Sequence, residues 1–265
     1  MRRQSVYLAA TAIALTMVGA RIPTQSASAK VPAQTEANTD IDPDAMAALT
    51  RMGTYLRSIK AFQVETTTTR DDVLDDGQLV QLDSKVNLLV RFPDKMRVEV
   101  TNPRQHRLYL YNGKDFTIFG ERVNYYATVP APETVSKLAI ELGDKYGLDI
   151  PLEDLFFWGT PQSKEKDITG ATDIGSSEIG GITCEHYSFR QKGLDWQVWI
   201  QLGDYPLPLK LVLTTLTDES RPQYSSTLTW NLAPSFNEAA FEFSAPPDAH
   251  KIPLATQNTP VGAAN

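Results

Sequence analysis

The chain has 265 residues, of which 42% are hydrophobic and 9% aromatic, with 25 lysines and arginines against 32 acidic residues. This composition can bury a core, so it excludes a wholly disordered or collagen-like chain. The net charge of −7 argues against a nucleic-acid partner, because such proteins normally carry a basic face. One cysteine cannot form an internal disulfide, and His106, His186 and His250 lack the spacing of a metal site. We therefore expect an acidic soluble protein without a metal or cofactor.

The first thirty residues have the pattern of a secretory signal peptide. Arg2 and Arg3 precede an apolar run at residues 6–20, and Ala27-Ser28-Ala29 offers a small-residue cleavage site. The run is shorter than the ~20 residues that a membrane-spanning helix needs, which favours cleavage over an uncleaved anchor. Loss of residues 1–29 removes three arginines and no acid, so the net charge changes from −7 to −10. We expect an exported protein with no stable membrane insertion.

Two flanking segments are expected to be disordered. Residues 30–43 are polar and contain two prolines, and residues 246–265 combine prolines with many small residues. The stretch between them, 44–245, has no low-complexity break. This organisation favours a single domain between a leader and a tail.

The domain begins with a predicted helix and continues into strands. Asp42-Pro43-Asp44 is a helix start, followed by apolar residues at helical spacing. From Phe62 to Phe119 the period of the apolar residues is two, with turn signals at Asp75-Asp76-Gly77 and Asn112-Gly113. Consecutive strands joined by short turns form an antiparallel meander.

Two helices are predicted to interrupt the strands. Residues 132–147 begin with Pro-Glu and end in glycine, and residues 151–159 carry a large apolar load that includes Phe156 and Trp158. Alternating strands resume after Lys166. The sequence therefore predicts an α+β fold: a strongly curved antiparallel sheet, an incomplete β-barrel, with helices packed as a lid on its concave face.

Motifs for phosphate or calcium binding are weak. Asp72, Asp76, Gly77 and Asp83 match four positions of a calcium loop, but their flanks are strands, so an acidic hairpin tip is the favoured interpretation. The glycine-rich segment 175–181 lacks the lysine of a phosphate loop and is interpreted as a turn.

Candidates for catalysis are equally weak. Cys184 and His186 lie two apart on one strand face, yet a buried structural cysteine is favoured over a nucleophile in an oxidising compartment. Glu153-Asp154 and Asp248 are interpreted as solvated acids. We predict no catalytic residues.

The strongest signal is a set of apolar residues on the strands and the second short helix. We expect them to face the helical lid, where they form either a packed core or the lining of an apolar cavity. Leu209 and Leu213 are expected on the same face. The candidate ligand-binding residues are Met96, Val98, Leu108, Leu110, Phe116, Ile118, Phe156, Trp158, Trp196, Val198, Ile200 and Leu211.

Three segments resemble a known family: RFPDKMRVEV (91–100), YNGKDFTIFGERVNYYATVPAPETV (111–135) and YGLDIPLEDLF (146–156). They are similar to the predicted periplasmic proteins with domain of unknown function 2092. That family is itself similar to the superfamily of the lipoprotein carrier LolA, its receptor LolB and the sigma-factor regulator RseB. Over residues 43–245 the resemblance implies a periplasmic, incomplete curved barrel with a helical lid and no assigned catalytic residue. Arg91 or Arg97 can be compared with the carrier's lid-holding arginine, but no motif match supports the transfer.

The leading hypothesis is a periplasmic, non-catalytic protein that binds a lipid or lipoprotein acyl chain between the sheet and the lid. The alternative is an envelope interaction or stress-sensor module, in which edge strands or exposed Tyr109, Tyr111, Tyr125 and Tyr126 contact a protein partner. A hydrolase assembled from residues far apart in sequence has the least support.

Overall fold

The computed structural model describes residues 41–257, so the predicted signal peptide and most of the predicted leader lie outside the described residues. The helices are α1 (Pro43–Ser58), α2 (Val135–Glu141), continued by a π-helical turn (Leu142–Tyr146), α3 (Asp154–Phe157), and two 3₁₀ helices (Lys164–Asp167 and Glu238–Phe241). The strands are β1 (Ala61–Val73), β2 (Leu79–Arg91), β3 (Lys95–Thr101), β4 (His106–Tyr111), β5 (Asp115–Gly120), β6 (Tyr125–Pro130), β7 (Ile168–Ile179), β8 (Ile182–Gln191), β9 (Leu194–Gln201), β10 (Pro208–Thr215), β11 (Gln223–Asn231) and β12 (His250–Lys251).

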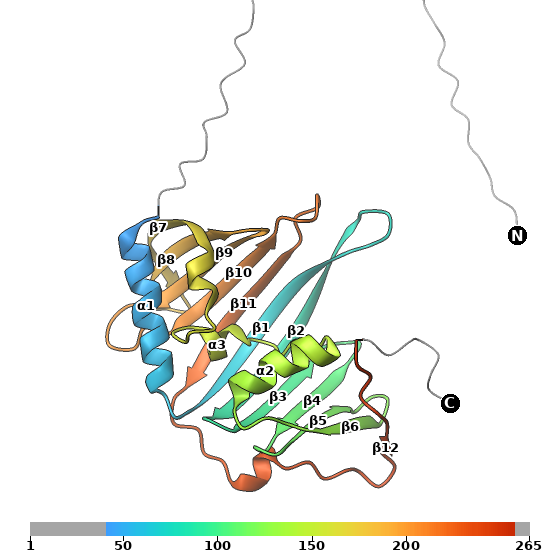
Figure 1. Cartoon of the computed structure of the whole chain (residues 1–265). Helices are drawn as coiled ribbons and strands as arrows, with labels where there is room; N and C mark the ends of the chain where they lie inside the picture. Colours follow the sequence, from blue (N-terminus) through green and yellow to red (C-terminus); the bar gives the residue numbers. More distant parts are fainter. Residues whose placement is uncertain (1–40, 258–265) are drawn as a thin grey trace, which may run out of the picture. The chain divides into compact units, whose positions relative to one another are not determined.

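The twelve strands form one sheet in the order β12-β6-β5-β4-β3-β2-β1-β11-β10-β9-β8-β7. Two antiparallel meanders, β1–β6 and β7–β11, are joined where β1 pairs with β11. The sheet is curved and does not close, and α1, α2 and α3 lie over its concave side (Figure 1). The predicted fold class is therefore confirmed.

Helix α1 forms for the reasons visible in its sequence. The Asp42 carboxylate accepts a hydrogen bond of 2.8 Å from the Asp44 N–H, and Pro43 occupies the first turn, where its missing N–H costs nothing. Its buried face contains alanines, leucines and a methionine, with Leu49 and Met52 fully enclosed. This amphipathic face packs over the β7 side of the sheet.

The concave face of the first meander is a continuous apolar layer. The register pairs Val98 with Leu88 on one side and Tyr109 on the other, and Met96 with Tyr111. Residues paired across strands share a face, so Tyr109 and Tyr111 lie on the concave face, toward the helices, and are buried. The prediction that these two tyrosines are exposed is wrong.

The same register corrects the placement of Leu108 and Leu110. Leu108 pairs with Glu99 and Leu110 with Arg97, which puts both leucines on the convex face, away from the helices. Leu110 is nevertheless buried, because the segment 232–249 crosses this face. Phe243 of that segment packs on Phe119 with ring centroids 5.5 Å apart. Both faces of β4 are therefore covered. The alternation of apolar residues along β4 alone could not show which face lies toward the helices.

The chain after residue 245 is ordered through residue 257. Strand β12 pairs in parallel with β6, and the Ile252 N–H donates to the Tyr126 carbonyl at 2.8 Å. The Gln257 N–H donates to the carbonyl of Lys145 at 3.0 Å. The prediction of a disordered tail from residue 246 therefore differs from the structure over 246–257, because this segment covers the free edge of β6.

The glycine-rich segment is only partly a turn. Residues 175–179 belong to β7, with a bulge near Gly175, and the turn itself is Gly180-Gly181. Both turn glycines have positive φ, which explains the glycine pair.

Candidate functional site

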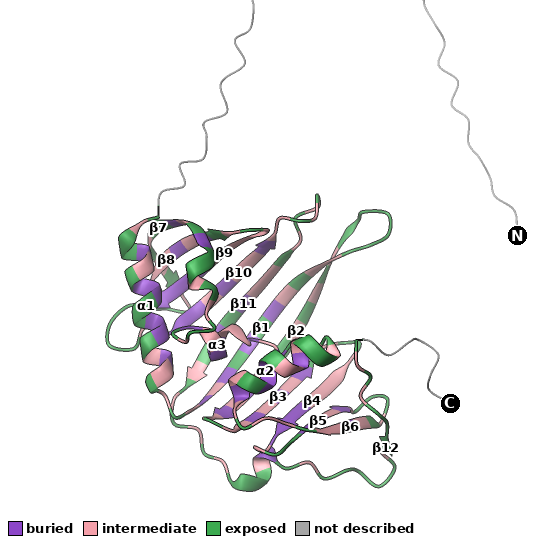
Figure 2. Ribbon diagram, viewed as in Figure 1, coloured by how far each residue is buried: buried purple, intermediate pink, exposed green. Residues whose placement is uncertain are grey.

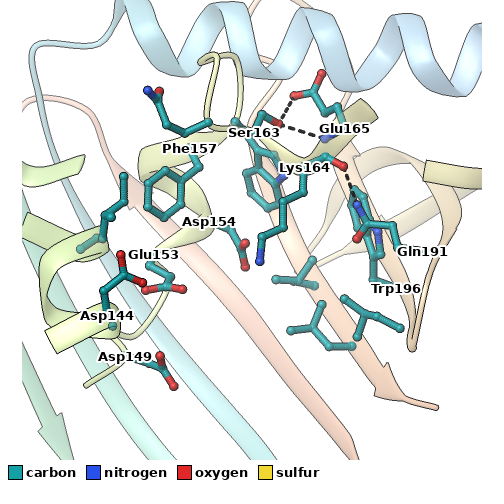
Figure 3. Close-up of a pocket in the computed structure, with 18 residues that line it drawn as sticks. Asp144, Asp149, Glu153, Asp154, Phe157, Ser163, Lys164, Glu165, Gln191 and Trp196 are labelled. Carbon is teal, nitrogen blue, oxygen red and sulfur yellow. Dashed lines mark hydrogen bonds between the residues drawn. The ribbon is translucent and has the colours of Figure 1, made fainter. Parts of the chain in front are cut away.

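A cavity of about 540 Å³ lies between the lid and the β9–β10 part of the concave face (Figure 3). Its upper boundary is formed by α2 and by the lid segment, defined here as residues 148–167, which contains α3. Its size falls within the ~300–1,000 Å³ typical of small-molecule sites. The lining residues are Ala139, Ile140, Gly143, Asp144, Asp149, Glu153, Asp154, Phe157, Trp158, Gln162, Ser163, Lys164, Glu165, Gln191, Leu194, Trp196, Leu211 and Leu213.

Helix α1 holds the lid segment in place from outside the cavity. The partly buried Arg57 guanidinium donates hydrogen bonds to the carbonyls of Leu155 and, at 3.1 Å, Phe156. These carbonyls belong to the four-residue helix α3, whose short length leaves them without helical partners. The backbones of Gly53 and Gly159 also approach closely, since a Cβ on Gly53 would lie 2.6 Å from the Gly159 nitrogen. The lid segment thus contacts α1 through its backbone and through one partly buried cation.

The apolar side of the cavity is dominated by the tryptophan wall, Trp158 and Trp196. Their rings stack with centroids 6.3 Å apart and an interplanar angle of 25°. Phe189 stacks behind Trp196 at 4.3 Å and fixes its orientation. Leu211 and Leu213 of β10 continue this surface. The Trp196 indole N–H is buried and has no acceptor among the described residues, a cost that the surrounding packing must offset.

The opposite side of the cavity is the acidic rim, Asp144, Asp149, Glu153 and Asp154 (Figure 3). Burial raises the pKa of Glu153 to about 7, and the charges of Asp154 and Asp149 add to the shift. Burial also raises the pKa of Asp154, whose carboxyl group has no hydrogen bond or ion pair within residues 41–257. The interpretation of Glu153-Asp154 as fully solvated acids differs from the structure, in which both residues are half-buried and line the cavity.

Asp154 faces the middle of the sheet. Burial raises the pKa of Tyr224 on β11, its hydrogen bonds with Thr68 and Ser226 lower it, and the charge of Asp154 raises it. Beside Tyr224 runs a buried hydroxyl chain in which Thr68 Oγ1 lies 2.9 Å from Thr66 Oγ1 and 3.1 Å from Ser226 Oγ. The acidic rim therefore borders a polar strip between the two apolar halves of the concave face.

One lysine, Lys164, lines the cavity and forms no ion pair among the described residues. Its backbone carbonyl accepts a 2.7 Å hydrogen bond from Gln191, and the neighbouring Glu165 accepts one of 2.8 Å from the Ser163 hydroxyl. These bonds anchor the end of the lid segment near β8. Among the lining residues, five carboxyl groups therefore face a single cation.

The structure distributes the twelve predicted ligand-binding residues over three environments. Trp158, Trp196 and Leu211 line the cavity. Leu108 and Leu110 lie on the convex face, where the register excludes contact with the lid. The others lie on the concave face or in α3 but do not line the cavity: Met96, Val98, Phe116, Ile118, Phe156, Val198 and Ile200.

Other sequence candidates have local structural roles. His186 stacks on Trp199 at 3.9 Å and is hydrogen bonded to Gln197, while Cys184 is buried. Arg91 pairs with the Glu238 carboxylate and Arg97 with Glu99, so neither reaches the lid segment.

The remaining acidic candidates also make local contacts. Asp76 accepts a 3.0 Å hydrogen bond from the Gln78 N–H, and Asp83 accepts one of 2.8 Å from the Thr69 hydroxyl. Within residues 41–257 no cluster of three or more histidine, cysteine or acidic side chains is arranged to hold a metal ion.

These features define a class of protein: an unclosed, curved β-sheet with a helical lid and a cavity of small-molecule size beneath it. The chain belongs to the family of predicted periplasmic proteins with domain of unknown function 2092, whose family model matches residues 45–255. The protein is periplasmic, as the sequence predicted. None of the helices described in residues 41–257 has the length and hydropathy needed to cross a bilayer.

Comparison with solved structures finds similar chains of low identity. Lipoprotein LppX from Mycobacterium tuberculosis matches with 10% identity and a TM-score of 0.40, over 74% of this chain and 100% of its own. LprF from Mycobacterium bovis matches with 12% identity and a TM-score of 0.40, over 79% and 99%. A LolA superfamily protein from Nitrosomonas europaea matches with 11% identity and a TM-score of 0.37, over 75% and 97%. Comparison with curated proteins gives no match.

Proposed function

We propose that this periplasmic protein is a non-catalytic carrier or receptor that encloses the alkyl chain of a lipid or lipoprotein in the cavity beneath the lid segment. The observation that carries the proposal is the 540 Å³ cavity with the tryptophan wall and two leucines on its sheet side. Transfer of an alkyl chain from water into this cavity contributes a favourable free energy of ~0.8 kcal/mol per methylene group that is buried. The loss of ligand freedom offsets part of this gain, so binding of moderate affinity is expected.

Several features support a binding role over a structural one. The cavity interrupts a layer that is otherwise tightly packed, since Leu88, Met96 and Phe116 on the same face are fully buried. Its size and its mixed apolar and polar lining are those of a small-molecule site.

The proposal is tested with delipidated protein incubated with a bacterial membrane extract. Native mass spectrometry should then show lipid adducts, and the emission of Trp158 and Trp196 should change on binding because both rings line the cavity. Leu213→Trp should fill the cavity and weaken binding by about tenfold or more, equivalent to about 1.4 kcal/mol.

The matched control is Val212→Trp, which adds the same side chain on the same strand. Val212 is adjacent to Leu213 on β10 and therefore points to the opposite face of the sheet. This variant should bind as the unmodified protein does. The proposal fails if no adduct forms, or if the two tryptophan variants weaken binding equally.

A further inference from the structure

We propose that the ligand of this cavity is an amphiphile with a cationic amine head group, held with its charge at the acidic rim and its alkyl part against the tryptophan wall. This inference rests on the proposed function and specifies the class of lipid that it would bind. It depends on four features of the cavity: its charge, a half-buried carboxyl group without a hydrogen bond, its aromatic side chains and its apolar floor.

The charge of the cavity is strongly one-sided. Lys164 is the single cation on the lining, against Asp144, Asp149, Glu153, Asp154 and Glu165. The Glu165 carboxylate accepts hydrogen bonds from Ser163 Oγ at 2.8 Å and from the Gly159 N–H at 3.4 Å, so its charge is partly compensated within the lid. The four carboxyl groups of the acidic rim have no ion pair with Lys164. An anionic head group would meet net repulsion here, whereas a cation would be attracted.

Asp154 is the group that most directly requires a partner. Asp154 is half-buried on the cavity lining, and within the described part of the chain its carboxyl group forms no hydrogen bond or ion pair, so that the nearby charge of Lys164 is its partial compensation. Partial removal from water disfavours the ionised form of a carboxyl group that has no hydrogen-bond donor, which is why burial raises the pKa of Asp154. An ammonium group placed beside it supplies both the counter-charge and, where the nitrogen carries hydrogens, the missing donors.

The aromatic side chains add a second means of recognising a cation. Phe157, Trp158 and Trp196 all line the same cavity as the acidic rim. Tryptophan faces attract ammonium ions, and combinations of aromatic rings with acids are the usual recognition elements for alkylated amines. The leucine floor formed by Leu211 and Leu213 then accepts the alkyl part. The apolar and acidic surfaces thus match the two ends of one amphiphile.

The proposal predicts a pH dependence through Glu153. The charged or titratable groups around it are Asp149 and Asp144 on its own side, Asp154 on α3, Lys164 on the following 3₁₀ helix and Tyr224 on β11. Its pKa of about 7 in the free protein means that it carries a proton at mildly acidic pH. A bound cation favours the ionised carboxylate, so affinity for the cation should increase as the pH rises through 7.

The experiment compares three probes with the same twelve-carbon chain below their micelle concentrations: dodecyltrimethylammonium, dodecyl maltoside and dodecyl sulfate. The trimethylammonium charge does not depend on pH, so any pH dependence comes from the protein. At about pH 8 the cationic probe should bind about tenfold tighter than the maltoside, and the preference should shrink at about pH 5.5, where Glu153 is protonated. Calorimetry or tryptophan fluorescence measures each affinity.

The decisive variant combines Glu153→Gln with Asp154→Asn, which keeps the size of both side chains. It should lose the preference for the cation and the pH dependence while binding the maltoside as before. The control variant, Asp75→Asn with Glu178→Gln, removes the same charge from exposed positions outside the cavity and should retain both properties. A thermal unfolding curve for each variant checks that it is folded.

The outcomes separate this inference from the proposed function. Equal binding of the cationic and nonionic probes, unaffected by the decisive variant, overturns the inference and leaves lipid binding intact. Tightest binding of dodecyl sulfate also overturns it and identifies Lys164 as the head-group contact. Failure of all three probes to bind overturns the proposed function itself, and this inference with it.

Discussion

The two halves of the concave face have similar strand patterns but different interiors. Under α2, the β2–β5 half is fully packed, with Leu88, Met96 and Phe116 removed from solvent. Under the lid segment and the end of α2, the β9–β10 half contains the cavity. Figure 2 shows buried positions along the strands of both halves. The strands of the two halves are alike, so the elements that cover them determine which half has a packed interior and which has a cavity.

The covering elements differ in the residues that they direct inward. Helix α2 and the turn after it bury Val135, Leu138 and Leu142 against the sheet. Helix α3 has only four residues, and its Phe156 packs edge-on against Phe92 at 6.4 Å, so that ring contributes to the packed half. The lid segment also buries Ile150, Leu152, Leu155 and Trp158. Above β9 and β10, however, it presents carboxyl groups beside Phe157 and Trp158, and these groups border the open space.

The largest expected effect is on stability, when one leucine in each half is replaced by alanine. Leu88→Ala in the packed half should cost about 3 kcal/mol or more, because it removes a fully enclosed side chain and leaves a void. Leu213→Ala on the cavity should cost about 1 kcal/mol, because its side chain already borders open space. Urea unfolding of both variants measures the difference. Similar costs would mean that the two halves are equally packed.

The next effect tests how the lid segment is held. Arg57→Met removes the donors to the Leu155 and Phe156 carbonyls and should cost about 2 kcal/mol, as expected for partly buried bonds from a charged group. Hydrogen exchange should become faster in residues 153–158 and stay unchanged in β3 and β4. The control is Arg51→Met on the same helix, which removes only an exposed ion pair of 3.8 Å with Glu185. Equally fast exchange in β3 and β4 would contradict the distinction between the halves.

The smallest expected effect is the change in stability when one carboxyl group of the acidic rim, that of Glu153, is removed. The pKa of Glu153 is raised from 4.5 to about 7 in the folded protein, so the folded state binds the proton more tightly than the unfolded chain does. Stability from this group is therefore greatest below pH 4.5 and is lost as the pH rises through 7. After allowance for solvent screening, Glu153→Gln should stabilise the protein by about 1 kcal/mol at pH 8.

The measurement for this variant is chemical unfolding at several pH values. Glu153→Gln should flatten the decrease in stability between about pH 5 and pH 8. Glu133→Gln, which changes an exposed side chain, provides the control. An unchanged pH profile in Glu153→Gln would show that the rim carries no such cost.

Much of the fold could be predicted because its signals are local. The cap at Asp42-Pro43, the switch to a period of two at Phe62 and the turns at Gly77 and Gly113 all act through neighbouring residues. The predictions for Leu108 and Tyr109 were wrong for a different reason. Both faces of β4 are covered, so apolar residues occupy both sets of alternating positions, and only the pairing with β3 selects the concave set.

The candidate site was only partly predictable. The tryptophan wall could be anticipated because large aromatic side chains on strands and short helices normally seek burial. The acidic rim could not, because Glu153-Asp154 has the sequence of an exposed pair and becomes half-buried only when the lid segment packs between α1 and the sheet. A short helix that combines two acids with three large aromatics is the one local signal that could have drawn attention to it.

The sequence by itself determined the order of the elements and the alternation of the strands, and it predicted an export signal, since each depends on residue types at short spacing. Only the tertiary structure decided that the second meander is left partly uncovered. That outcome depends on where the lid segment lies over the curved sheet. Its position is set by contacts between distant segments, such as the hydrogen bond from Arg57 to the Leu155 carbonyl, which joins residues almost a hundred positions apart. The cavity is therefore a property of packing that no single stretch of the chain contains.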